Sequence, residues 1–115
     1  MEYAVFDIET DGLLDTVSKF HVGVTRFVGD VLSPFLPPFD NAPGFISTLV
    51  EFINGKPGRK IVGHNIIRYD FPALKILYPH LSDQIDLLEK NCIDTLPLAW
   101  HLWFERAESN QSFGL

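Results

Sequence analysis

The sequence predicts a single α/β domain, with a mixed five-stranded sheet and helices on its faces. Three strand-like segments come first along the chain, and segments with helical spacing then alternate with two short apolar segments. A meander of three strands followed by alternating helix and strand is typical of a mixed sheet covered by helices. The 115 residues suffice for one hydrophobic core, so residues 1–115 are expected to form one domain.

Alternation of apolar and polar residues predicts the first three strands. In residues 3–9 the alternation separates two faces: Tyr3, Val5, Asp7 and Glu9 on one, and Ala4, Phe6 and Ile8 on the other. A second strand is expected at residues 19–28, and a hairpin turn with a shorter third strand at 29–35. Four prolines within residues 33–44 predict a loop.

Helices and strands alternate in the rest of the chain. Apolar residues at helical spacing predict a helix over residues 45–53, which the segment NGKPG ends. A short strand at 59–65 follows.

The next helix is expected over residues 69–80, with Asp70 as its cap and Pro72 in its first turn. Residues 82–89 are expected to add a helical turn or two. A fifth strand at 91–96 leads into a last helix at 95–107, which Asp94 or Thr95 can cap.

Composition restricts the partners. The net charge of −6 argues against binding duplex nucleic acid by broad phosphate neutralisation, but it leaves room for a site that meets phosphate through metal ions. No apolar run approaches the roughly 20 residues that span a bilayer, and no leader precedes the first strand, so no membrane contact is expected. The single cysteine, Cys92, is interpreted as a small buried hydrophobe, and a reducing cytoplasm is the expected compartment.

Two acids at the exit of the first strand suggest a metal site. Asp7 and Glu9 lie two residues apart, about 6.5–7 Å along a strand, and point to the same face. Such a pair can lean toward two divalent cations, although it could also mark the solvated end of the strand. Asp70 follows a strand that should run parallel to the first, which would bring it to the same edge of the sheet. A plain helix cap is the alternative for Asp70.

The blocks FDIETDGL (6–13) and GHNIIRYDFPAL (63–74) resemble the first and second motifs of the DnaQ-like (DEDD) superfamily of 3′-to-5′ exonucleases. The closest resemblance is to the proofreading exonuclease domain of phage-type family A DNA polymerases. There, NCIDTL (91–96) and TVSKFHVGV (16–24) also have counterparts. The resemblance implies an RNase H-like fold and metal-dependent hydrolysis of single-stranded DNA in DNA replication.

The resemblance also implies roles for individual residues. Asp7, Glu9 and Asp70 would be the catalytic metal ligands for two Mg²⁺ or Mn²⁺ ions. Substrate contacts would come from Thr10, Leu13, His64 and Asn65, with Leu13 packing against the terminal base. The alternatives are that Leu13 folds back on the core and that His64 and Asn65 satisfy local backbone groups. Tyr69 is interpreted as a packing residue, and Asp94 as a helix cap rather than a ligand.

The resemblance breaks at the family's fourth acid, an aspartate preceded four residues earlier by tyrosine or histidine. No aspartate follows Asp94, Glu105 and Glu108 lie in or just after the last helix, and the family's C-terminal helices are missing. Three interpretations stay open. The chain is complemented by a partner chain carrying the motif, it is a weak nuclease alone, or it is a non-catalytic interaction or inhibitory protein on a degenerate exonuclease scaffold.

The expected partners follow from these interpretations. They are the 3′ end of single-stranded DNA or a nucleotide, a polymerase or complementary chain, and a second copy of this chain. Trp100 and Trp103 are candidates for contact with another protein, with core packing as the equal alternative. For a phage-encoded chain the compartment would be the host cytoplasm.

Overall fold

The computed structural model describes residues 2–29 and 32–96. Along the chain the strands and helices are β1 (Tyr3–Thr10), β2 (Phe20–Val28), β3 (Leu32–Phe35), α1 (Ala42–Gly55), β4 (Lys60–Gly63), α2 (Phe71–Leu77), α3 (Ser82–Lys90) and β5 (Cys92–Asp94). A single π-helical turn (Ile66–Asp70) precedes α2, and a 3₁₀ turn (Pro79–Leu81) precedes α3. This confirms the predicted order of five strands and the interleaved helices.

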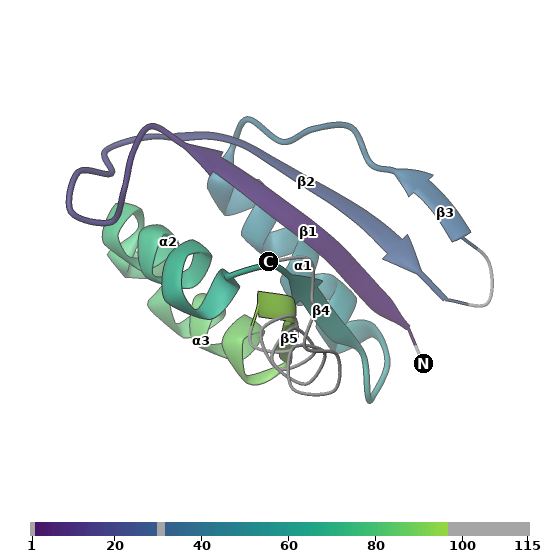
Figure 1. Cartoon of the computed structure of the whole chain (residues 1–115). Helices are drawn as coiled ribbons and strands as arrows, with labels where there is room; N and C mark the ends of the chain where they lie inside the picture. Colours follow the sequence, from purple (N-terminus) through teal and green to yellow (C-terminus); the bar gives the residue numbers. More distant parts are fainter. Residues whose placement is uncertain (1, 30–31, 97–115) are drawn as a thin grey trace, which may run out of the picture.

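The five strands form one mixed sheet in the order β3-β2-β1-β4-β5 (Figure 1). β1 is antiparallel to β2 and parallel to β4, and β5 is parallel to β4. The carboxyl ends of β1, β4 and β5 therefore lie at the same edge of the sheet. In an open α/β sheet this is the edge where ligands bind.

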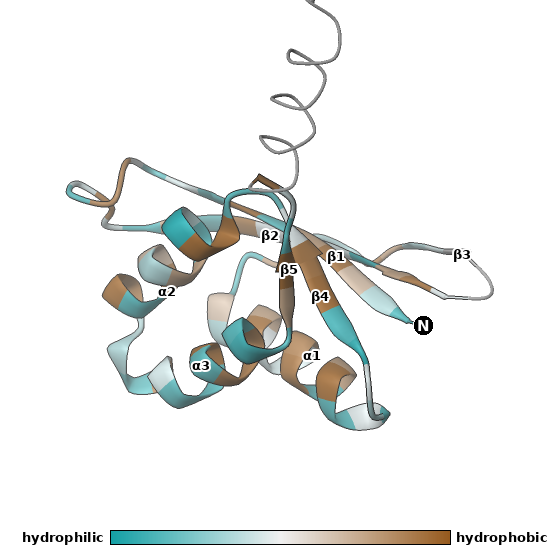
Figure 2. Cartoon of the chain, turned by 60° about the horizontal axis from the view of Figure 1, so that its bottom comes forward, coloured by the Kyte–Doolittle hydropathy of each residue, from teal (hydrophilic) through white to brown (hydrophobic). Residues whose placement is uncertain are grey.

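The alternation predicted for β1 is confirmed. Ala4, Phe6 and Ile8 are at most 5% exposed, whereas Val5 is 40% exposed on the opposite face. Figure 2 shows α1, α2 and α3 together on one side of the sheet, and the buried face of β1 packs toward them.

An aromatic cluster forms the centre of this core. Phe45 of α1 is fully buried, and its ring centroid lies 6.2 Å from that of Phe6, 6.3 Å from Phe20 and 5.5 Å from Phe39. The helix therefore packs against β1, β2 and the segment that leads into α1.

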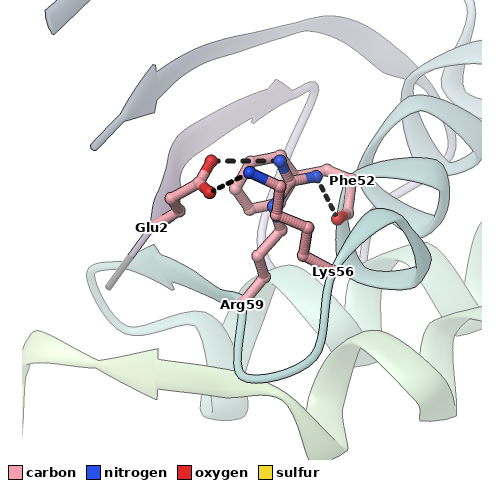
Figure 3. Close-up of polar contacts among 4 residues, drawn as sticks. All are labelled: Glu2, Phe52, Lys56 and Arg59. Carbon is pink, nitrogen blue, oxygen red and sulfur yellow. Dashed lines mark hydrogen bonds and ion pairs between the residues drawn. The ribbon is translucent and has the colours of Figure 1, made fainter. Parts of the chain in front are cut away.

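Polar contacts fasten the opposite end of the sheet, where β1 begins (Figure 3). Glu2 pairs with Lys56 at 3.2 Å and with Arg59 at 3.0 Å. The Arg59 guanidinium also lies over the Phe52 ring, 4.4 Å from its centroid, and donates to the Phe52 carbonyl at 2.9 Å. These contacts hold the start of β1 against the end of α1, far along the strand from Asp7 and Glu9.

Several predicted boundaries were wrong, for local reasons. The helix predicted from residue 45 begins at Ala42, inside the proline-rich segment predicted as a loop, because Asn41 caps it by accepting the Gly44 N–H at 3.1 Å. Pro43 fits the first turn, where its missing N–H costs nothing.

The strand predicted to reach residue 65 ends at Gly63, because Asn65 adopts a left-handed conformation with φ of 61°. The predicted helix over 69–80 is instead the π-helical turn, α2 and the 3₁₀ turn in succession. Only the start of the predicted last helix, Thr95 and Leu96, is described. Trp100, Trp103, Glu105 and Glu108 lie outside the described residues.

Across residues 2–29 and 32–96, none of the helices is both long and apolar enough to cross a bilayer.

Candidate metal-binding and nuclease site

The acids predicted for the site gather at the carboxyl edge of the sheet. Asp7 and Glu9 lie in the second half of β1, Asp70 follows β4 within the π-helical turn, and Asp94 ends β5. Because β1, β4 and β5 are parallel, segments distant in the sequence meet at this edge. The topology therefore places the first two motifs at the same edge of the sheet.

Asp7 and Glu9 are both exposed, on the face of β1 opposite the core. The β1–β2 register shifts between Glu9 and Thr10: Glu9 lies opposite Val22, but Thr10 lies opposite Phe20. A bulge of this kind bends a strand and redirects its side chains, and bulges are frequent next to active sites. The two carboxylates are accessible to an approaching ligand.

Asp70 does not cap a helix, contrary to that expectation. Its backbone is already right-handed helical (φ −61°, ψ −51°), because the π-helical turn runs directly into α2, and its side chain makes no capping bond. The residue is only 4% exposed, and Oδ2 is buried without a hydrogen-bond partner among the described residues. A carboxylate left unpartnered in the interior carries a large desolvation penalty.

The surroundings of Asp70 favour its protonated form. Burial, together with the negative charges of Asp7, Asp94 and Glu9, raises the pKa of the Asp70 carboxyl to about 7. Burial is the largest cause of this shift, and repulsion from the neighbouring acids acts in the same direction.

The segment between β4 and α2 is shaped by unusual backbone. Asn65 lies in the left-handed region, which asparagine tolerates better than most residues, and its carbonyl accepts the Tyr69 N–H at 3.0 Å. The Phe71 N–H bonds to the Ile66 carbonyl, which closes the π-helical turn that contains Asp70. Asn65 Oδ1 is a second buried oxygen for which the described part of the chain supplies no partner.

Tyr69 was expected only to pack, but it also makes hydrogen bonds. Its hydroxyl bonds to the Thr10 hydroxyl and to the Gly12 carbonyl, so it ties the segment that carries Asp70 to the exit of β1. The Thr10 hydroxyl also donates to Gly12 O at 3.2 Å. Thr10 lies where it was predicted, but its hydroxyl is already engaged.

Leu13 projects from the turn after β1. The Asp11 carboxylate closes this turn by accepting the N–H groups of Ser18 and Lys19, both at 2.9 Å. The Ser18 hydroxyl and these backbone donors hold the pKa of Asp11 at about 2. Leu13 is 73% exposed, so the alternative that it folds back on the core is wrong. An exposed leucine beside the acids is available to a ligand.

His64 and Asn65 lie between the ends of β4 and β5. The exposed His64 ring contacts the Thr95 hydroxyl through Nδ1 at 2.8 Å, and the Thr95 hydroxyl also reaches Gly63 O at 3.4 Å. The Asn65 side chain caps nothing, and its N–H is held at 2.8 Å by Asp94 Oδ1. Local hydrogen bonds thus engage the His64 ring and the Asn65 N–H. The substrate contacts of these two residues stay predictions.

Asp94 accepts the Leu96 N–H at 2.9 Å, as expected of the cap of the helix that begins at Thr95. Its carboxylate also accepts the N–H groups of Asn65 and Ile67, which no local pattern predicts. Burial works to raise the pKa of Asp94, but the donors of Ile67, Leu96 and Asn65 outweigh it, and the pKa is lowered. Three backbone N–H groups thus use most of the hydrogen-bonding capacity of the Asp94 carboxylate.

The carboxylates of Asp7, Glu9 and Asp70 are of the chemical type that binds a divalent cation, although they do not form a complete set of metal ligands in this structure. Among the residues that the structure describes, no three histidine, cysteine or acidic side chains are arranged as ready metal ligands. Mg²⁺ prefers carboxylate oxygens and retains several waters, so it needs only a few protein ligands. The unpartnered Oδ2 of Asp70 is an oxygen of this kind, held at the edge that carries Asp7 and Glu9.

Comparison with known proteins identifies the family of this chain. The model of the RNase H superfamily matches residues 4–112. The chain is 38% identical over 96 residues to the DNA-directed DNA polymerase of Enterobacteria phage T3, and 36% identical over 96 residues to that of Escherichia phage T7. Each alignment covers 83% of this chain but 13% of the polymerase, so the chain spans a small part of these relatives. The chain belongs to the RNase H superfamily.

Proposed function

We propose that the chain is, or forms part of, a metal-dependent 3′-to-5′ exonuclease of the proofreading type that acts on single-stranded DNA. The observation that carries the proposal is Asp70, a buried carboxyl with an unpartnered oxygen, at the same sheet edge as Asp7 and Glu9. A buried carboxyl oxygen that lacks a hydrogen-bond partner among the described residues is explained by a ligand. The phage DNA polymerases that the chain resembles support DNA as the substrate.

Asp7, Glu9 and Asp70 are the proposed holders of two Mg²⁺ or Mn²⁺ ions. When bound, such ions supply activation of water and neutralisation of charge on the scissile phosphate. Asp70 would bind as its carboxylate, so metal binding would have to displace the proton that its raised pKa retains near neutral pH. Asp7 and Glu9, exposed on β1, face an incoming phosphodiester.

The remaining residues would orient the strand end. Leu13, exposed on the turn that Asp11 holds closed, is placed to pack against the terminal base. Tyr69 and Thr10 fix this turn relative to the acids. The exposed His64 ring offers a polar group at the ends of β4 and β5. Positioning of this kind contributes strongly to hydrolysis, because it replaces a bimolecular encounter with a held geometry.

The proposed activity should be weak in this chain alone. A group of catalytic residues that act together loses orders of magnitude in rate when one is absent. Residues 95–115 hold no aspartate, so the family's fourth acid would have to come from outside residues 1–115. A partner chain that supplies it should raise the rate steeply.

A non-catalytic interaction protein is the second candidate. It is favoured by the lack, within residues 2–29 and 32–96, of three side chains arranged as ready metal ligands. On this alternative the acids would persist without turnover, and the chain would act by binding a polymerase or another protein.

One assay separates the two candidates. Single-stranded DNA labelled at its 5′ end is incubated with Mn²⁺ and either the wild type or the Asp7→Ala/Glu9→Ala variant. The matched control, Glu51→Ala/Asp83→Ala, removes one glutamate and one aspartate from exposed positions of α1 and α3. Stepwise shortening by the wild type and the control, but not by the Asp7 and Glu9 variant, supports the exonuclease. Equal inertness of all three proteins, with and without a partner chain that carries the fourth acid, supports the alternative.

A further inference from the structure

The Asp94 carboxylate makes a dense set of contacts with the backbone beside the candidate site. Oδ1 accepts the N–H groups of Asn65 at 2.8 Å and Leu96 at 2.9 Å, while Oδ2 accepts the N–H of Ile67 at 3.0 Å. A cap needs only the Leu96 bond. The other two bonds join the end of β5 to the segment after β4, about thirty residues earlier in the chain.

These two bonds are made at the point where the backbone changes direction. Asn65 is the one non-glycine residue with positive φ in the part of the chain that the structure describes. A residue in this conformation carries strain and persists where its surroundings hold it. Asp94 fixes the N–H on each side of Ile66, the first residue of the π-helical turn.

The constraint is transmitted to Asp70 through the turn itself. The Asn65 carbonyl accepts the Tyr69 N–H, and the Ile66 carbonyl accepts the Phe71 N–H. Asp70 lies between these two donors. Its own carboxylate has no capping bond that would hold it in place. The position of Asp70 thus depends on a backbone that Asp94 anchors at its start.

We propose that Asp94 is a positioning residue: from the end of β5 its carboxylate holds the backbone of Asn65 and Ile67, and so sets where the Asp70 carboxylate lies. The part of this proposal that concerns metal affinity rests on the proposed function. The part that concerns the backbone of Asn65 and Ile67 is independent of that function. Asp94 touches neither substrate nor metal in this proposal, and its two oxygens accept three backbone N–H groups instead. Partners that orient a ligand from outside commonly change metal affinity or activity by about 10- to 100-fold when mutated.

Two variants remove the hydrogen bonds of Asp94 completely or in part. Asp94→Ala removes both carboxylate oxygens and, with them, all three hydrogen bonds. Asp94→Asn keeps one oxygen, which can still accept from Asn65 and Leu96, but sets an NH₂ group against the Ile67 N–H. The control for a lost cap is Asn41→Ala, which removes the cap of α1 without touching this segment. The control for lost charge is Asp83→Asn, at an exposed position of α3.

Amide hydrogen exchange without metal tests the anchoring directly. In Asp94→Ala we expect protection to fall at Asn65 and Ile67, and with them at Tyr69 and Phe71. In Asp94→Asn we expect the loss to begin at Ile67. Unchanged protection of these amides, or an equal loss in Asn41→Ala, overturns the proposal. Should Asp94→Ala fail to fold, Asp94→Asn gives the result.

Binding of Mn²⁺, followed by the electron paramagnetic resonance of the free ion, tests the consequence for the site. We expect affinity to fall about tenfold or more in Asp94→Ala and less in Asp94→Asn, with no change in either control. An equal fall in Asn41→Ala would mean that general destabilisation is the cause, and it overturns the positioning role. A wild type that binds no Mn²⁺ refutes the proposed nuclease, while the exchange data still judge the anchoring.

Discussion

Replacing Asp70 by asparagine should stabilise the metal-free protein at alkaline pH. The carboxyl is 4% exposed, Oδ2 has no partner in the described part of the chain, and burial together with Asp7, Asp94 and Glu9 raises its pKa from 3.8 to about 7. Asparagine has nearly the same shape but no charge. The variant therefore removes the cost of ionising Asp70 while leaving the surrounding structure in place.

The sign and size of the effect follow from proton linkage. The folded state holds the Asp70 proton more tightly than the unfolded state, so the free energy of unfolding falls as pH rises from about 4 to about 7 and stays low above that range. Each pKa unit corresponds to about 1.4 kcal/mol, so full ionisation costs up to about 4 kcal/mol. Between pH 5 and pH 8 the wild type should lose roughly 2–3 kcal/mol relative to Asp70→Asn.

Urea unfolding in EDTA at pH 5 and pH 8 measures this difference for the wild type, Asp70→Asn and the control Asp83→Asn. The control removes an exposed charge from α3 and should follow the wild type. Added Mg²⁺ or Mn²⁺ should raise the melting temperature of the wild type at pH 8 and leave Asp70→Asn nearly unchanged. A constant difference between the wild type and Asp70→Asn at the two pH values would refute the buried, proton-binding state of Asp70.

Three further variants test other parts of the structure. Leu13→Ala should leave the free energy of unfolding within about 0.5 kcal/mol of wild type, because Leu13 is 73% exposed, yet weaken binding of a single-stranded 3′ end several-fold in fluorescence anisotropy; unchanged binding would remove Leu13 from the site. Tyr69→Phe loses the hydroxyl that joins Thr10 and Gly12 O, and urea unfolding should show a loss of about 1 kcal/mol; a loss near zero would mean that these bonds add nothing. Gly23→Ala places a Cβ 2.8 Å from the Phe45 ring and should cost roughly 1–3 kcal/mol in the same measurement, whereas wild-type stability would contradict the close packing of β2 on α1.

The order of the strands and helices, and which residues lie on each face of β1, could be predicted from the sequence, because alternation and helical spacing are local properties. Asp7 and Glu9 could be placed for the same reason: a strand of period two puts both on the face opposite Phe6 and Ile8. The parallel arrangement of β1 and β4 then followed from general rules of topology, and it brings Asp70 to the same edge.

The setting of Asp70 could not be predicted in this way. An aspartate just before a Phe-Pro pair fits a helix start, but the π-helical turn begins at Ile66, so Asp70 lies within continuous helical backbone and its side chain turns inward. The contacts of Asp94 and Tyr69 were missed because their partners lie 27–29 and 57–59 residues away in the sequence. The one available indication was a polar residue at a strand end, which suits a cap equally well.

The central claim is that Asp7, Glu9 and Asp70 share divalent metal. Crystals soaked in Mn²⁺ at pH 8 and measured at the manganese absorption edge test it most directly. We expect anomalous peaks within coordination distance of these three carboxylates, with Mn²⁺ as the partner that Oδ2 of Asp70 lacks among the described residues. Well-ordered crystals without a peak beside these residues, or with Mn²⁺ bound only elsewhere on the surface, would contradict it.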